Sequence, residues 1–122
     1  LPGIDGEKMS KSKNNAIFFS DSEREIRKKI LGAFSGGQKT IEEHKKTGGN
    51  PEVDVSCIYL KYLFLESKES EKLFKDYKEG KILSVDVKKL FAEKVIGFIK
   101  EFQNNLKNID EKIVEKCILR ND

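Results

Sequence analysis

"SVDVKKLFAEKVIGFIKEFQNNLKNIDEKIVEKC", residues 84–117, is the longest stretch of the chain with one continuous periodicity. From Val87 to Cys117 its apolar residues recur at steps of three and four, which average close to the ~3.6-residue period of an α-helix. The spacing predicts one long helix or two nearly collinear ones, with any break at Asn104 and Asn105. The chain is therefore predicted to be mainly α, organised around this segment.

Shorter helices are predicted upstream of this segment from capping signals. Two overlapping pairs, Ser20 with Glu23 and Ser22 with Glu25, fit the capping box, in which a hydroxyl accepts a hydrogen bond from a free helix amide. Thr40 with Glu43 fits it further along the chain. Residues 53–65 are apolar nearly all round, and their β-branched and aromatic side chains would also suit a strand. Because the segment is long for a strand, we interpret it as a buried helix.

Two further segments complete the expected element order. "SEKLFKDYKEG", residues 70–80, predicts an amphipathic helix that ends at its glycine. "AIFF", residues 16–19, is short, apolar and β-prone, and predicts a short buried strand. The sequence thus predicts a basic loop, one strand and a helical bundle.

The composition suits one small domain with a modest core, since 37% of the 122 residues are hydrophobic. The formal charge of +3 arises within residues 1–50, so a polyanionic partner is expected to touch that part first. No apolar run is long enough to span a bilayer, and no membrane partner is expected. Cys57 and Cys117 lie apart in apolar stretches, which favours buried free thiols and a reducing cytoplasm. The opening "LPGIDG" is typical of an internal loop, and predicts a fragment of a longer polypeptide.

The loop "GEKMSKSKNN", residues 6–15, concentrates three lysines and two serines. Ammonium groups can neutralise the charge that grows on a leaving pyrophosphate, and hydroxyls and loop amides can donate to its oxygens. A loop that closes as the transition state forms would stabilise that state more than bound ATP. The alternative from charge alone is a solvated basic loop.

The letters of this loop resemble a known signature. "KMSKS", residues 8–12, reproduces that of class I aminoacyl-tRNA synthetases. "NAIFFSD", "AFSGG", "TIEEH" and "GGNPEVDVS" then follow in the order and spacing of tryptophanyl-tRNA synthetases of the archaeal and eukaryotic type, and "DYKEGKILSVDVKK" before a long helix resembles their C-terminal end. The sister tyrosyl enzymes share the loop but usually lack these motifs, and no visible residue belongs to the amino-acid pocket.

The resemblance implies ATP-dependent activation of L-tryptophan, with Mg²⁺ bound mainly through ATP, and transfer of the amino acid to tRNA(Trp). Lys8 and Lys11 would be the catalytic residues that hold the ATP phosphates. Ser10 and Ser12 would support the loop and donate hydrogen bonds, and the backbone near Met9 would lie close to the adenosine. A role of Met9 as an apolar anchor is equally compatible. Related enzymes commonly carry alanine where Lys11 stands, so its share in catalysis stays open.

The resemblance also divides the chain into two parts. Residues 1–20 would end a Rossmann-type catalytic domain, and residues 21–122 would form the anticodon-binding domain. Gln38, Lys39 and Lys88 match positions that approach the anticodon, although Gln38 and Lys39 replace an Arg-Asp pair common in the eukaryotic enzymes. For Lys88 the alternative is a solvated first helical turn.

Two classes of function follow from these patterns. The first is a fragment of a cytoplasmic, homodimeric ligase, inactive in isolation because it lacks a nucleotide-binding sheet and an amino-acid pocket. The second is a non-catalytic helical module that binds RNA or protein. A HIGH-type motif upstream would distinguish them. His44, the only histidine, is expected to cap or pack, and no metal ligands are expected.

Overall fold

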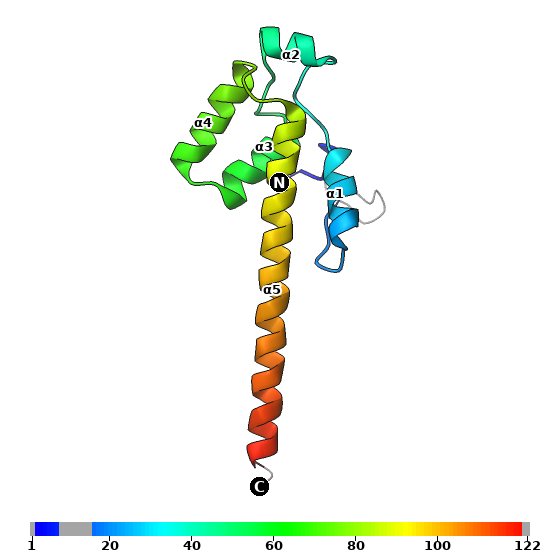
Figure 1. Cartoon of the computed structure of the whole chain (residues 1–122), viewed down its shortest axis with the longest axis vertical. Coiled ribbons are helices and arrows are strands. Elements are labelled where there is room, and N and C mark those ends of the chain that lie inside the picture. Colours follow the sequence, from blue (N-terminus) through cyan, green and yellow to red (C-terminus); the bar gives the residue numbers. More distant parts are fainter. Residues whose placement is uncertain (1, 8–15, 121–122) are drawn as a thin grey trace.

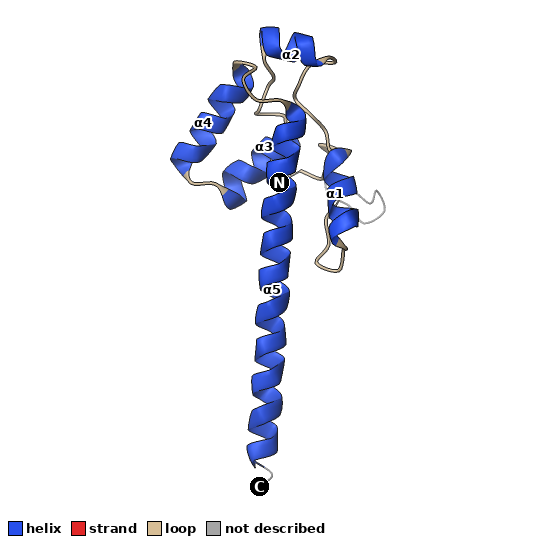
Figure 2. Ribbon diagram, viewed as in Figure 1, coloured by secondary structure: helices blue, strands red, loops and turns tan. Residues whose placement is uncertain are grey.

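The computed structural model describes residues 2–7 and 16–120, and in this part of the chain every regular element is a helix (Figure 2). The elements are α1 (Glu23–Leu31), α2 (Ile41–Thr47), α3 (Val55–Tyr59), the π-helix η1 (Leu60–Phe64), α4 (Ser67–Lys78) and α5 (Ser84–Arg120). Figure 1 shows α5 as a long axis, with α1 on one side of its upper part and α4 on the other. The prediction of a mainly helical chain is confirmed.

The long helix is continuous, and the break considered at Asn104 and Asn105 does not occur. Both asparagines are exposed, so water can satisfy their amides and the side chains need not compete with the helix backbone. The upper part of α5 supplies core residues, among them Val87, Phe91 and Ile99. The helical period therefore continues through the polar pair as the apolar spacing predicted.

Helix α1 begins at the second of the two predicted capping boxes, and the box at Ser20 with Glu23 is wrong. The Ser22 hydroxyl accepts from the Glu25 amide, and the Glu25 carboxylate accepts from the Ser22 amide. Ile26 and Ile30 are buried in the same core as α5. Leu31, the last residue of the helix, is 66% exposed.

Within residues 53–65, residues 55–64 are helical, and the strand alternative is wrong. Asp54 caps α3 by accepting from the Cys57 amide at 2.9 Å, and Cys57 is a buried free thiol. After Tyr59 the helix widens to the π form. Leu60 is still fully buried, but Tyr62 is 65% and Leu63 57% exposed, so the segment is buried only in part.

The strand predicted at residues 16–19 is wrong. These residues form an irregular segment and a turn, in which the Phe18 amide donates to Asp21 Oδ2 at 3.0 Å and the Asp21 amide to the Phe18 carbonyl at 3.0 Å. The Ala16 carbonyl accepts from Lys29 Nζ at 3.0 Å. These groups are satisfied by a side chain of α1 and by Asp21, and the described residues offer no strand for pairing.

Candidate functional site

The lysine loop falls outside the described residues. Lys8, Met9, Ser10, Lys11 and Ser12 all belong to it, and their roles stay predictions from sequence. The residues before it are anchored to the bundle, because the Phe34 amide donates to the Ile4 carbonyl at 2.8 Å and the Tyr59 hydroxyl donates to the Pro2 carbonyl. The chain therefore enters the loop from a fixed point beside α3.

Gln38, Lys39 and Lys88 meet in one place in the fold. They line a single groove of about 270 Å³, formed by the loop before α2, the start of α2, the start of α5 and the end of α1. The other lining residues are Leu31, Thr40, Ile41, His44, Leu83, Ser84 and Val85. The structure thus brings together two segments that lie far apart in sequence, and we call this hollow the first groove.

Lys88 crosses from α5 to the end of α1. Its Nζ donates to the carbonyl of Leu31, the last residue of α1, at 2.8 Å. A helix C-terminus has unpaired carbonyls and partial negative charge, so an ammonium group is stabilising there. Burial lowers the pKa of Lys88, and the charge of Asp54 acts in the opposite direction. Lys88 is thus half-buried and bonded to α1, and its role toward a ligand stays a prediction.

Gln38 and Lys39 project from a loop that is held firmly in place. Gln38 Nε2 donates to the carbonyl of Gly48 at 2.9 Å, across the end of α2. Gly48 has a φ of +75°, and a Cβ atom there would lie 1.7 Å from the Lys78 carbonyl oxygen, so only glycine fits. Lys39 is exposed. One side chain is thus committed to the loop, while the other is open to a ligand.

A buried carboxylate fixes this loop to three helices. Asp54, 1% exposed, accepts from the Gly36 amide at 3.0 Å and from the Tyr77 hydroxyl at 2.8 Å. The Tyr77 hydroxyl also lies 2.9 Å from Ser84 Oγ, which accepts from Ser35 Oγ at 2.8 Å. We call these side chains the polar hub. It joins the loop before α2 to α3, α4 and the first residue of α5, and so determines the shape of the first groove.

His44 has the packing role expected from sequence. It is 3% exposed, its ring lies edge-on to Tyr77 at 4.9 Å between centroids, and its Nε2 lies 2.8 Å from the Ile82 carbonyl oxygen. Since a carbonyl can only accept, Nε2 carries the proton. Among the side chains that the structure describes, those of residues 2–7 and 16–109, no three His, Cys, Asp or Glu are placed to hold a metal ion.

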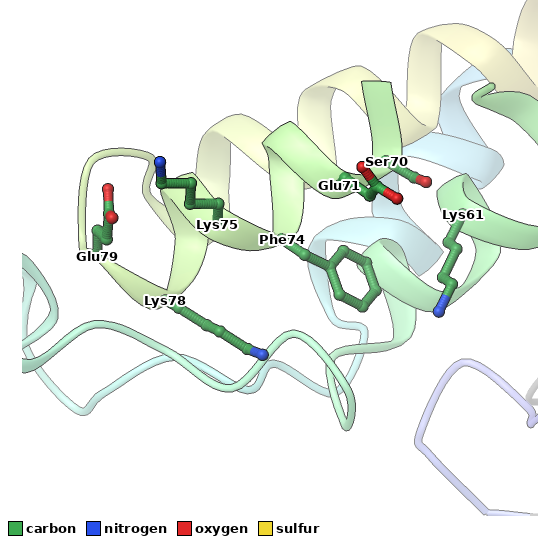
Figure 3. Close-up of a pocket in the computed structure, with 7 residues that line it drawn as sticks. All are labelled: Lys61, Ser70, Glu71, Phe74, Lys75, Lys78 and Glu79. Carbon is green, nitrogen blue, oxygen red and sulfur yellow. The ribbon is translucent and has the colours of Figure 1, made fainter. Parts of the chain in front are cut away.

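A larger hollow, of about 420 Å³, lies on the other side of the bundle, between α4 and η1 (Figure 3). The ring of Phe74 forms its centre, and Lys61 Nζ lies 5.2 Å from the centroid of that ring. Its charged residues are of both signs, with Lys61, Lys75 and Lys78 against Glu71 and Glu79. This mixture gives the hollow no clear preference for an anion or a cation.

Comparison with known proteins defines the class. The family model described as tRNA synthetases class I (W and Y) matches residues 1–100. The matched region includes the lysine loop, the first groove and the upper part of α5. The chain belongs to this family of class I tRNA synthetases.

Within the class, the relatives are tryptophan enzymes. The chain is 39% identical over 123 residues to the cytoplasmic tryptophan–tRNA ligase of Saccharomyces cerevisiae, covering 98% of the chain and 28% of the relative. It is 38% identical over 120 residues to the enzyme of Methanocaldococcus jannaschii, covering 94% and 32%. It superimposes on the tryptophanyl-tRNA synthetase from Giardia lamblia with a TM-score of 0.80 and 44% identity, covering 85% and 27%. The chain thus spans about a third of these proteins or less.

Within residues 2–7 and 16–120, no helix combines the length and the apolar character that a membrane-spanning segment requires.

Proposed function

We propose that this chain is the C-terminal part of a tryptophan–tRNA ligase. The complete enzyme would activate L-tryptophan with ATP and Mg²⁺ and transfer it to tRNA(Trp), as a cytoplasmic homodimer. Residues 1–20 would end the catalytic domain, and residues 21–122 would bind the anticodon. The names of the relatives support the substrate, since the yeast and archaeal proteins are both tryptophan–tRNA ligases.

The first groove carries the proposal for anticodon binding. It gathers Gln38, Lys39 and Lys88, the three residues for which the sequence predicts contact with the anticodon. Single-stranded RNA is bound through phosphates and through the edges and faces of unstacked bases. Lys39 and Lys88 offer positive charge at the rim, while Ile41 and Val85 offer apolar surface against which a base or ribose can pack.

The lysine loop would contribute to the chemical step. Lys8 and Lys11 would neutralise the charge that develops on pyrophosphate as tryptophanyl-adenylate forms, and Ser10 and Ser12 would donate to its oxygens. Met9 would lie by the adenosine.

Lys39→Ala in the complete enzyme tests the anticodon assignment. Lys39 is exposed, so its truncation should leave the fold intact, whereas Lys88→Ala would also unpair the Leu31 carbonyl. We expect the kcat/KM of tRNA(Trp) charging to fall roughly 5- to 100-fold, the range for losing one specific contact to RNA. Tryptophan-dependent pyrophosphate exchange should be unchanged, because it needs no tRNA.

The matched control is Lys68→Ala, an exposed lysine on α4. It should change neither reaction. Charging that survives Lys39→Ala and Gln38→Ala at the wild-type rate would reject the first groove as the anticodon site. A parallel loss of pyrophosphate exchange would point to the catalytic centre instead.

A further inference from the structure

A second groove of about 190 Å³ lies between α1 and α5, directly beside the first. The two grooves share Leu31, Val85 and Lys88. The remaining lining residues of the second groove are Arg27, Ile30, Lys89 and Ala92. The side chain of Lys88, which crosses from α5 to the Leu31 carbonyl, lies between the two grooves. Since the grooves share these lining residues, we treat them as one surface and call it the track.

Every charged residue that lines this track is basic. Lys39 belongs to the first groove, Arg27 and Lys89 to the second, and Lys88 to both. A purely basic lining is not general in this lysine-rich chain, since both acidic and basic side chains line the larger hollow on α4. A track with charge of one sign focuses its field on an anionic ligand.

The basic groups of the second groove are available to a ligand. Arg27 lies 3.2 Å from Glu23 Oε1, but both side chains are 49% exposed, and such surface pairs contribute only about 0 to 1 kcal/mol. Lys89 is exposed on the first turns of α5. A phosphate could therefore replace Glu23 beside Arg27 at little cost.

We propose that the second groove carries the sugar-phosphate backbone of RNA that leaves the first groove, with Arg27 and Lys89 each contacting a phosphate. This inference rests on the proposed anticodon site and extends it by two residues that sequence motifs did not indicate. The apolar lining residues Ile30, Val85 and Ala92 suit contact with riboses, whereas the basic side chains suit phosphates. Contacts of this kind fix the register of RNA without recognising its sequence.

An acidic peptide is the other class of ligand that could match this charge. Continuity with the first groove favours RNA, because Lys88 lines both hollows and one strand can pass along them. The two ligands differ in how binding responds to salt and to competitors, and this difference defines the test.

The experiment measures binding of the anticodon stem–loop of tRNA(Trp) to the complete enzyme over a range of salt concentrations. Each lost phosphate contact lowers the slope of log K against log salt by about 0.7 for single-stranded RNA. We expect this reduction for Arg27→Gln and again for Lys89→Gln, with the preference for the native anticodon unchanged. Lys68→Gln, which removes the same charge from α4, should keep the wild-type slope.

The outcomes separate this inference from the proposed function. Wild-type slopes in both variants, with native-anticodon preference intact, would overturn the backbone path and leave the anticodon site standing. A variant that loses anticodon preference at unchanged slope would also overturn it, since that is the behaviour of a base contact. A wild-type chain without anticodon preference would reject the first groove, and RNA displaced only by an acidic peptide would identify the competing ligand.

Discussion

The upper and lower parts of α5 have the same apolar spacing but different surroundings. Phe91 in the upper part is 1% exposed and packs with Tyr59, whose ring is 5.3 Å away between centroids. In the lower part Leu106 is 47% and Ile109 52% exposed. Periodicity therefore determines that a segment is helical, whereas burial depends on which other elements reach it. In Figure 1 the upper part is surrounded by helices and the lower part extends away from them.

The turn at residues 18–21 contacts the lower part of α5. Phe19 stacks on Phe102 with ring centroids 4.6 Å apart, and Gln103 Nε2 donates to the Phe19 carbonyl at 3.1 Å. Lys29 and Asp21 hold this turn through an ion pair of 2.7 Å. Three sets of substitutions test the contrast between the two parts of α5 through their effects on stability.

Phe91→Ala should have the largest effect. Truncating a fully buried phenylalanine removes apolar burial and leaves a cavity, so the free energy of unfolding should fall by about 3 to 5 kcal/mol. Phe102→Ala is the matched change in the lower part, where an exposed aromatic pair contributes about 1 kcal/mol. Denaturant unfolding followed by circular dichroism measures both. Equal losses would show that the lower part is as enclosed as the upper one.

Tyr77→Phe should have an intermediate effect, because it removes the central hydroxyl of the polar hub. Asp54 Oδ2 and Ser84 Oγ would each lose a partner inside the core, which costs about 1 to 3 kcal/mol. Hydrogen exchange at the Gly36 amide should also accelerate. Tyr62→Phe is the control, since Tyr62 is 65% exposed. Unchanged stability with Tyr77→Phe would mean that the hub does not hold the upper part of α5 together.

The ion pair at the turn should have the smallest effect, visible as a dependence on pH. Burial alone would raise the pKa of Asp21, but the hydrogen bonds from Lys29 and the Phe18 amide outweigh it, and the pKa lies below its usual value. A depressed pKa stabilises the fold above the unfolded value, and this stabilisation is lost as pH falls below about 4.

Asp21→Asn should therefore show a shallower loss of stability in acid than the wild-type chain. Glu101→Gln, which alters an exposed carboxylate on α5, should follow the wild-type curve. Identical acid profiles for Asp21→Asn and the wild type would exclude the ion pair as the link between the turn and α1.

The sequence predicts those features that depend on local chemistry. The capping residues Ser22 and Thr40 and the period of α5 were visible because each involves neighbours within a few positions. The convergence of Gln38, Lys39 and Lys88 was expected from the family resemblance, and the geometry agrees with it. Local sequence patterns alone do not indicate that these three side chains line one groove.

The features that sequence did not predict depend on distant partners. Asp54 caps α3 with one oxygen, and its second oxygen accepts from Gly36 and Tyr77, far away in sequence. The Lys88 Nζ bond to the Leu31 carbonyl joins residues 57 positions apart, so no local sequence pattern indicates it. The segment at residues 16–19 has a strand composition, and fails to form one because Lys29 and Asp21 take its backbone groups.

The unbroken length of α5 makes it a lever. Its 37 residues, at a rise of about 1.5 Å each, form a rod of roughly 55 Å. Lys88 lies near the start of this helix, where both grooves meet. By simple geometry, each degree by which a bound ligand tilts this end displaces the opposite end by about 1 Å over such a length. A pair of probes near the two ends would therefore report rearrangements at the grooves that are too small to measure there directly.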